Sequence, residues 1–334
     1  MNWKEGFSAA YHMTFIDPVT WRDLERFEIT GGNINRETGG MMQSADIDTL
    51  DFPTGEERYI RIYLDARQET GGERVALFTG LATTPDDDYN GVIKSNTVQC
   101  YSVLKAADDV LLQRGYYVPA GIDAGVILVR LLSDVPAPVS VAEGSPSLRS
   151  SIVADEDDSC LDMVQKVVAA INWHIRLTGR GEIIIEPLPD DVSETFDPLG
   201  NDCIENQITV SHDWYSCPNV FRAIDEDLTA IARDDSEDSP LSTVNRGREI
   251  WMQDTSCNLA DDESIGQYAA RRLKEEQRNA LSGSYKRRFI PDLMPGDLIY
   301  LKYPKQGMNG VFRITSQSIS LEYGATTSEE VVNE

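Results

Sequence analysis

Residues 86–93 carry the chain's closest match to a metal-binding motif, because their oxygen atoms have the spacing of a calcium loop. Asp86, Asp88 and Asn90 would supply ligands at the first, third and fifth positions, and a glycine follows at the sixth. The twelfth position, where such loops need a bidentate carboxylate, holds Thr97, and strand-like patterns flank the segment. An Asn-Gly hairpin turn with acidic residues at its tip explains the same residues, and we favour it.

A second candidate metal site combines Cys203, His212 and Cys217 with the neighbouring Asp213. The spacing matches no familiar zinc pairing, so we expect these cysteines to pack as small buried hydrophobes. The chain has five cysteines, an odd number without a CxxC pair. This usage is typical of reduced thiols in a protein made in a cytosol.

The sequence contains no recognisable set of catalytic residues. The chain lacks G-x-S-x-G and the common phosphate-binding glycine motifs, and it has only three histidines. Glu182 and Glu186 could be paired as glycosidase carboxylates, but among 56 acidic residues an arbitrary pair carries almost no information. The residues therefore predict a non-catalytic, β-rich scaffold with no catalytic, cofactor-binding or metal-binding residues.

The composition describes a strongly anionic globular chain. Its 334 residues allow two or three domains, and 30 Lys and Arg against 56 Asp and Glu give a formal charge of −26. This balance argues against a protein that grips nucleic-acid phosphates, and a hydrophobic share of 41% argues against general disorder. The longest aliphatic run, 126–129, ends at Arg130, so we predict no membrane span.

The elements that would position these residues begin with antiparallel strands. Apolar and polar residues alternate in several short segments of the first hundred residues, which suggests a barrel or a sandwich. We expect Gly31-Gly32 and Gly39-Gly40 to break the chain between strands. The expected strands are 11–15, 59–64, 75–81 and 96–103.

The middle of the chain changes to a helical period, with Asp123 as a candidate N-cap. The expected helices lie near 103–114, 123–133 and 158–172, the expected hairpin spans 174–186, and the expected proline-bearing linkers are 135–146 and 187–200. Strands return after about residue 206. Those expected are 207–210, 219–224, 284–290, 297–303 and 310–321, with a long loop over 225–243 and a helix near 262–278.

Charge is distributed unevenly along this series of elements. Residues 151–240 hold 21 acidic and 5 basic residues, whereas residues 271–313 hold 10 basic and 4 acidic ones. Regions of opposite sign in one chain can form complementary faces between identical subunits. The alternative is two solvated surfaces that never meet.

Three blocks of the C-terminal third resemble the hub proteins at the tip of phage tails and of contractile injection systems. The acidic segment 235–240 followed by Asn245-Arg246-Gly247-Arg248 resembles a hub loop that ends in a strand start. Residues 264–273 are similar to the family's Ala-x-x-x-Leu helix. Residues 291–300, which contain Pro-x-Leu-x-Pro-Gly-Asp, resemble the entry to the family's closing strands.

The resemblance implies an α+β, β-rich fold with two tail-tube-like antiparallel β-barrel domains. These would be residues 1–105 and 206–330, with an α+β segment, 106–205, on the flank and the helix near 262–278 inserted in the second barrel. Such hubs are homotrimers in which the barrels build a pseudo-sixfold ring, joining the hexameric tail tube to the threefold tip or spike. The ring forms part of the DNA-ejection channel.

The implied location is the tail of a virion, with the chain synthesised in the cytoplasm of the bacterial host. The implied partners are a tail tube or distal tail protein, a central tip or spike protein and a tape measure protein. Double-stranded DNA would pass through without specific binding, because acidic side chains in the lumen repel phosphate; solubility of the free subunit also explains the acidic residues. The alternatives are a tail-associated cell-wall hydrolase and a calcium-dependent binding module of the tail tip.

Overall fold

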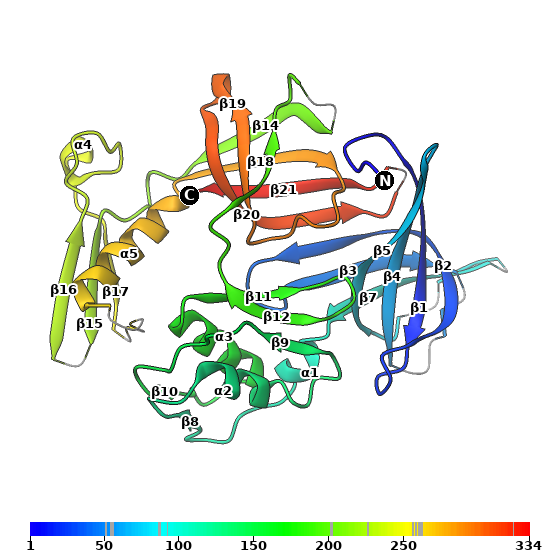
Figure 1. Cartoon of the computed structure of the whole chain (residues 1–334), viewed down its shortest axis with the longest axis horizontal. Helices are drawn as coiled ribbons and strands as arrows, with labels where there is room; N and C mark the ends of the chain where they lie inside the picture. Colours follow the sequence, from blue (N-terminus) through cyan, green and yellow to red (C-terminus); the bar gives the residue numbers. More distant parts are fainter. Residues whose placement is uncertain are drawn as a thin grey trace.

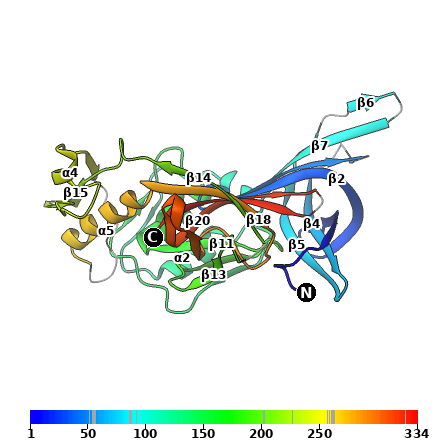
Figure 2. The ribbon, with the colours of Figure 1, turned by 90° about the horizontal axis from the view of Figure 1, so that it is seen from above.

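The computed structural model shows a β-rich α+β chain in which one long, mainly antiparallel sheet connects two groups of strands (Figures 1 and 2). A smaller α+β unit and an inserted unit lie on the periphery. The structure describes residues 1–50, 52–53, 57–85, 88–91, 93–200, 203–225, 227–255, 257, 259, 263–322 and 324–334.

The first group of strands closes on itself through backbone pairing. The order β1-β4-β5-β7-β3-β2 returns to β1, because β1 pairs with both β4 and β2, and every pairing in this ring is antiparallel. The ring encloses a core that includes Met13, Phe15, Ile47, Ile62 and Phe78. The strands are β1 (Ser8–Ile16), β2 (Asp23–Glu37), β3 (Gln43–Thr49), β4 (Arg58–Gln68), β5 (Gly71–Ala82), β6 (Asp88–Asn90) and β7 (Ile93–Ser102).

The four strands expected in this region are confirmed, but the role given to Gly31-Gly32 is wrong. Both glycines lie inside β2, beside an irregularity in its register with β3. Gly32 has a φ of +131°, and a Cβ there would stand 2.2 Å from the Asp46 carbonyl oxygen. The glycine therefore lets two strands approach closely, and it does not end the strand.

The second group forms a sheet with the order β13-β19-β20-β21-β18-β14, in which only β13 and β19 run parallel. Residues 316–320 of β20 also pair with residues 33–37 of β2, so the two groups form one continuous sheet. The sequence analysis missed β13 and β21. The strands are β13 (Val192–Phe196), β14 (Ile204–His212), β18 (Leu281–Arg288), β19 (Leu298–Tyr303), β20 (Met308–Ser320) and β21 (Thr326–Asn333).

The α+β unit packs two helices against a three-stranded sheet. Asp123 and Ser159 are the N-caps of these helices. The Asp123 side chain accepts a hydrogen bond from the Val126 N–H, and Ser159 forms a capping box with Asp162. The expected helices 123–133 and 158–172 and the hairpin 174–186 are confirmed. The elements are α1 (Lys105–Asp108), β8 (Tyr117–Val118), α2 (Ala124–Leu131), β9 (Val139–Val141), β10 (Ile152–Val153), α3 (Cys160–Ala170), β11 (Trp173–Leu177) and β12 (Ile183–Pro187).

Three expectations for residues 103–200 are wrong. The helix expected over 103–114 ends after α1, because Leu111 forms a β-bridge with Ser159 and Leu112 N–H donates to the Asp158 carbonyl. The segment 135–146, expected to be a linker, contains β9, which pairs in parallel with β12. Likewise, the expected linker 187–200 contains β13.

Residues 213–280 form an inserted unit between β14 and β18, whose adjoining ends pair at His212 and Leu281. The helix near 262–278 was expected as an insertion in the second barrel. As α5 it lies in this inserted unit, and its buried face packs on the unit's own strands through Tyr268, Ala269 and Leu273. The loop expected over 225–243 contains β16, and α4 begins at its last residue. The elements are β15 (Val220–Asp225), β16 (Leu228–Arg233), α4 (Thr243–Arg246), β17 (Trp251–Asp254) and α5 (Ile265–Arg278). The domain boundaries stay a prediction.

Candidate functional site

One face of the long sheet is polar from one end to the other. Consecutive pairings connect β6, β7, β3, β2, β20, β21, β18 and β14, and alternate residues of these strands point to the same side. We call this side the polar face. Its residues include Asp88, Asn90, Ser95, Thr97, Gln99, Tyr101, Ser44, Asp46, Asp48, Asn33, Asn35, Glu37, Ser316, Ser318, Ser320, Thr326, Ser328, Glu330, Val332, Ser282, Ser284, Lys286, Arg288, Thr209 and Ser211.

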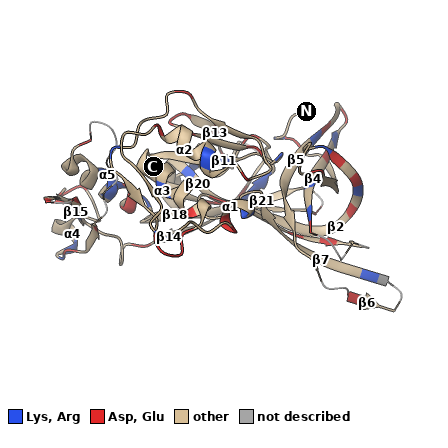
Figure 3. Cartoon of the chain, turned by 90° about the horizontal axis from the view of Figure 1, so that it is seen from below, with Lys and Arg blue, Asp and Glu red and all other residues tan. Residues whose placement is uncertain are grey.

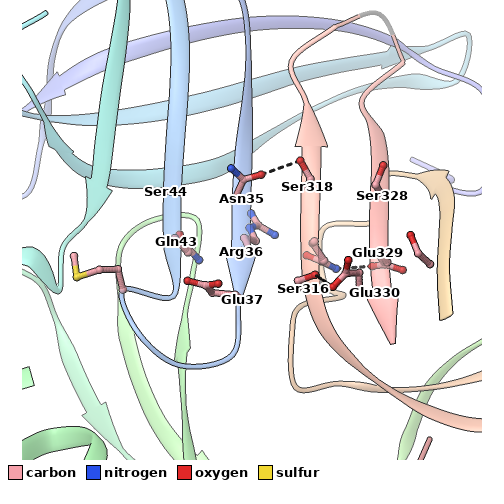
Figure 4. Close-up of a pocket in the computed structure, with 13 residues that line it drawn as sticks. Asn35, Arg36, Glu37, Gln43, Ser44, Ser316, Ser318, Ser328, Glu329 and Glu330 are labelled. Atoms are coloured by element: carbon pink, nitrogen blue, oxygen red, sulfur yellow. Dashed lines mark hydrogen bonds between the residues drawn. The ribbon is translucent and has the colours of Figure 1, made fainter. Parts of the chain in front are cut away.

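A cavity of about 430 Å³ lies in the middle of the polar face, where β2 meets β20 (Figure 4). Hydroxyl, amide and carboxylate side chains line it. The Ser318 hydroxyl donates to Asn35 Oδ1 at 2.9 Å, and the Ser316 hydroxyl donates to Glu330 Oε2 at 3.3 Å. Nearby, the Thr97 hydroxyl donates to Asp48 Oδ1 at 2.7 Å. The surface is wettable, and most of its side chains are neutral.

Charge on the polar face is sparse. Its carboxylates are Glu37, Asp46, Asp48, Asp88 and Glu330, and its cations are Lys286 and Arg288. Acidic side chains are also found on β2 near its start, away from the middle of this face (Figure 3). The polar face is thus only mildly anionic, and the chain's large negative charge is not concentrated there.

The opposite, buried face of the same strands contains a row of polar residues in register. The row runs across five strands, and each member is a direct cross-strand neighbour of the next. All are buried: Gln43, Arg36, Gln317, Glu329 and Tyr285. We call this row the buried polar row. Because polar groups in a core are costly without partners, its bonds must fix how the strands pair.

Glu329 is the centre of the buried polar row. It accepts hydrogen bonds from Tyr285 Oη at 2.6 Å, from Arg287 Nε at 2.8 Å and from Gln317 Nε2 at 2.6 Å. The Arg287 and Glu329 side chains are both fully buried. Burial lowers the pKa of Arg287, but the Glu329 charge outweighs it and holds that pKa above its ordinary value. Burial, with repulsion from Arg287, lowers the pKa of Arg36 to about 10.

The Pro-Gly-Asp motif lies at the joint between the second group of strands and the α+β unit. Asp297 Oδ1 accepts from Arg176 Nη2 on β11 at 2.8 Å, and Oδ2 accepts from the Met294 N–H at 2.8 Å. Burial raises the pKa of Asp297 above its ordinary value. Arg313 Nη1 donates to the carbonyl oxygen of Gly296 at 2.7 Å. The motif therefore positions one unit on another.

The residues of the zinc hypothesis are dispersed. Cys203 is buried in the core of the second strand group, and Cys217 packs in a separate small cluster with Leu241 and Ala280. His212 is exposed at the end of β14. All five cysteines are free thiols. Among the residues that the structure describes, no three His, Cys, Asp or Glu side chains lie close enough together to hold a metal ion.

Glu182 and Glu186, the carboxylates of the glycosidase hypothesis, do not form a catalytic pair. Glu186 forms an ion pair with Arg176 at 3.1 Å. Its carbonyl oxygen lies 3.1 Å from His174 Nδ1, and burial lowers the pKa of that histidine. Glu182 is only half-buried, at the turn between β11 and β12. These contacts assign Glu186 to the joint between units.

Of the calcium-loop residues, Asp86 lies outside the described part of the chain. Asp88 and Asn90 belong to β6, which forms an antiparallel hairpin with β7. The hairpin extends beyond the first ring of strands (Figure 2). Its shape agrees with the turn interpretation, and calcium binding stays an untested prediction.

Sequence analysis missed the polar face and the buried polar row. The sequence does contain a signal for the polar face. Over 316–320 serines alternate with Gln317 and Ile319, and in β18 Ser282 and Ser284 are again two residues apart.

In the described ranges, no helix combines the length and apolar character that crossing a membrane would require.

The sequence matches no known family and no curated protein. Its fold, in contrast, matches solved structures along the whole chain. A tail protein from Neisseria meningitidis MC58 superimposes with a TM-score of 0.71 at 12% identity, covering 99% of this chain and 97% of that one. The 43 kDa tail protein of prophage MuSo2 from Shewanella oneidensis gives 0.69 at 15% identity and 98% coverage of both chains.

A more distant likeness is the E. coli c3393 protein, with a TM-score of 0.52 at 8% identity, covering 98% of this chain and 74% of that chain. That protein is a component of the type VI secretion system and is structurally similar to the phage T4 tail proteins gp27 and gp5. The resemblance to tail hub proteins that the sequence predicts is thus confirmed as a likeness of fold, over the full length of the chain.

Proposed function

We propose that this chain is a structural protein of a phage tail tip or baseplate, a homotrimeric hub that joins the hexameric tail tube to a threefold tip or spike. The observation that carries this proposal is the full-length likeness to tail proteins from two different bacteria. In this role the closed ring β1-β4-β5-β7-β3-β2 and the second group of strands are the two tube-like barrel domains. The α+β unit and the inserted unit lie outside them.

The edges of the long sheet support assembly from several copies. Among the described residues, β14 pairs only with β18, and its nine residues include no proline or lysine that would protect a free edge. The other end of the second group, β13, is short, follows Pro189 and carries Glu194, which pairs with Lys4 at 2.8 Å. The contrast favours β14 as an edge that meets another subunit.

In the proposed ring, the polar face lines the channel. Its hydroxyl and amide groups keep the wall wet, and its few carboxylates oppose the accumulation of phosphate contacts that would slow DNA. Double-stranded DNA would then pass without specific binding. The neighbours along the tail axis would be a tube or distal tail protein on one side and the tip or spike protein on the other, with a tape measure protein as a further partner.

Light scattering on the purified chain over a range of concentrations tests the proposal. We expect a species near three times the 37.2 kDa monomer mass. Addition of the tube and tip proteins from the same tail should then give a complex that contains three copies of this chain. A chain that stays monomeric at every concentration, with and without those proteins, would refute the hub function.

A further inference from the structure

The inserted unit presents an exposed face that combines aromatic, aliphatic and cationic side chains. α5 covers one side of its small sheet, and cross-strand pairing places Arg222, Ile231, Arg233 and Trp251 on the other side. We call these four residues the outer face. Trp251 is 48% exposed and Ile231 is 51% exposed. An exposed apolar surface of this kind is unusual on a monomer that carries a charge of −26.

The side chains of the outer face are held in place. The Trp251 indole N–H donates to Glu249 Oε2 at 2.9 Å, and Arg233 pairs with the same carboxylate. Arg222 is bonded to the Gln253 side chain. Preordered tryptophan and arginine side chains are the residues that most often dominate binding energy at protein interfaces.

A second exposed apolar surface lies on the α+β unit, and carboxylates flank it, whereas Arg222 on the outer face has no carboxylate partner in the described contacts. Tyr117 and Val153 are cross-strand neighbours in β8 and β10, and both are more than half exposed. Asp155, Glu156 and Asp157 begin one residue after β10, and all three are exposed. We call these five residues the acidic patch. Lys166 and Arg114 neutralise two of its carboxylates, which leaves Asp157 without a cation in the described contacts.

We propose that the outer face of one copy packs against the acidic patch of the next copy. Apolar side chains would meet on both sides, and Arg222 would meet the carboxylate of Asp157. The two surfaces belong to different units of one chain, with β15–β17 in the inserted unit at the left of Figure 1 and β8 and β10 in the α+β unit at its bottom. Because the contact joins two different surfaces, it is head-to-tail. Such a contact closes into a ring when the rotation between neighbouring copies is one third of a turn, as the proposed trimer requires.

This inference rests on the proposed trimer, and it names a contact outside the barrels. The first test measures the concentration at which the trimer dissociates, for Trp251→Ala and for the matched control Trp214→Ala. Trp214 is 47% exposed on the same inserted unit but lies off the outer face. We expect at least tenfold weaker association for Trp251→Ala and less than a twofold change for the control, with unchanged circular dichroism in both.

The second test pairs two charge reversals. Arg222→Glu and Asp157→Arg should each weaken the trimer at least fivefold, and the double variant should recover most of the wild-type association. A photoreactive residue at position 231, in a mixture of isotope-labelled and unlabelled chains, should crosslink to the peptide that contains residues 153–157 of a different chain.

The outcomes separate this inference from the hub function. If the wild-type chain is trimeric but Trp251→Ala behaves like Trp214→Ala and the crosslinks fall elsewhere, the contact is wrong and the hub function stands. Lack of recovery in the double charge reversal also overturns the contact. If the wild-type chain is monomeric at every concentration, with and without its tail partners, both proposals fail.

Discussion

Replacing Glu329 by glutamine should strongly destabilise the chain, although the shape of the side chain hardly changes. The substitution removes the negative charge that Arg287 pairs with, and both side chains are fully buried. It also turns one acceptor of the Tyr285 and Gln317 bonds into a donor. Removing one partner of a buried ion pair costs about 3–5 kcal/mol, since the other charge remains without compensation.

That loss is large compared with the total stability of about 5–15 kcal/mol that is usual for folded proteins. Urea unfolding at 25 °C, followed by both tryptophan fluorescence and circular dichroism, measures it. The matched control is Glu330→Gln, one residue further along β21, because Glu330 lies on the exposed polar face. We expect the control to stay within about 0.5 kcal/mol of the wild type.

A double variant tests the physical reason for the loss. Arg287→Met combined with Glu329→Leu removes both charges and fills the space with apolar groups, so most of the stability should return. If Glu329→Gln costs less than about 1 kcal/mol, or if the double variant is no more stable than Glu329→Gln, the assignment of this ion pair as a main constraint on the sheet is refuted.

Three further predictions follow from single sites. Burial lowers the pKa of His12 and His174, so the unfolded chain binds more protons and the free energy of unfolding should fall as the pH drops below about 6.5; replacing both by asparagine should flatten that slope in urea titrations. Gly179→Ala would place a Cβ 1.8 Å from the Ala76 carbonyl oxygen, so we expect the β11–β12 turn to move away from β5 and the melting temperature to fall by several degrees. The control Gly266→Ala, which has open space around it in α5, should be neutral or stabilising. Calcium should leave the melting temperature unchanged if the Asp88 segment is only a hairpin, and a rise that Asp88→Ala abolishes would establish a calcium site instead.

The strands with a clear alternation of apolar residues were predictable from the sequence, and those with polar residues on the buried side were not. The buried side of β21 is formed by Thr327, Glu329 and Val331, and two of these three are polar. The pattern therefore gives no strand signal. The partners of Glu329 lie 12 to 44 residues away in the chain, and no local rule reveals that they will meet.

The position of the inserted unit was hidden for a different reason. Its helix α5 has a strong amphipathic pattern and a capping box at Ser264, so its existence and limits were predictable. The pattern says only that one side is buried, and not against which sheet. Here the side formed by Tyr268, Ala269 and Leu273 packs on the unit's own strands, since the chain returns to β18 directly after the helix.

The distribution of charge is informative about the proposed channel. A chain with a charge of −26 could have placed its carboxylates along the polar face, yet serine, threonine and asparagine occupy most positions there. Carboxylates gather instead on exposed segments such as 155–157 and 190–191, where they favour solubility of a free subunit. A wall of neutral hydroxyl groups offers DNA neither strong attraction nor strong repulsion. On this reasoning, replacing Ser318 and Ser328 by lysine should slow genome ejection in low salt, and high salt should restore the rate.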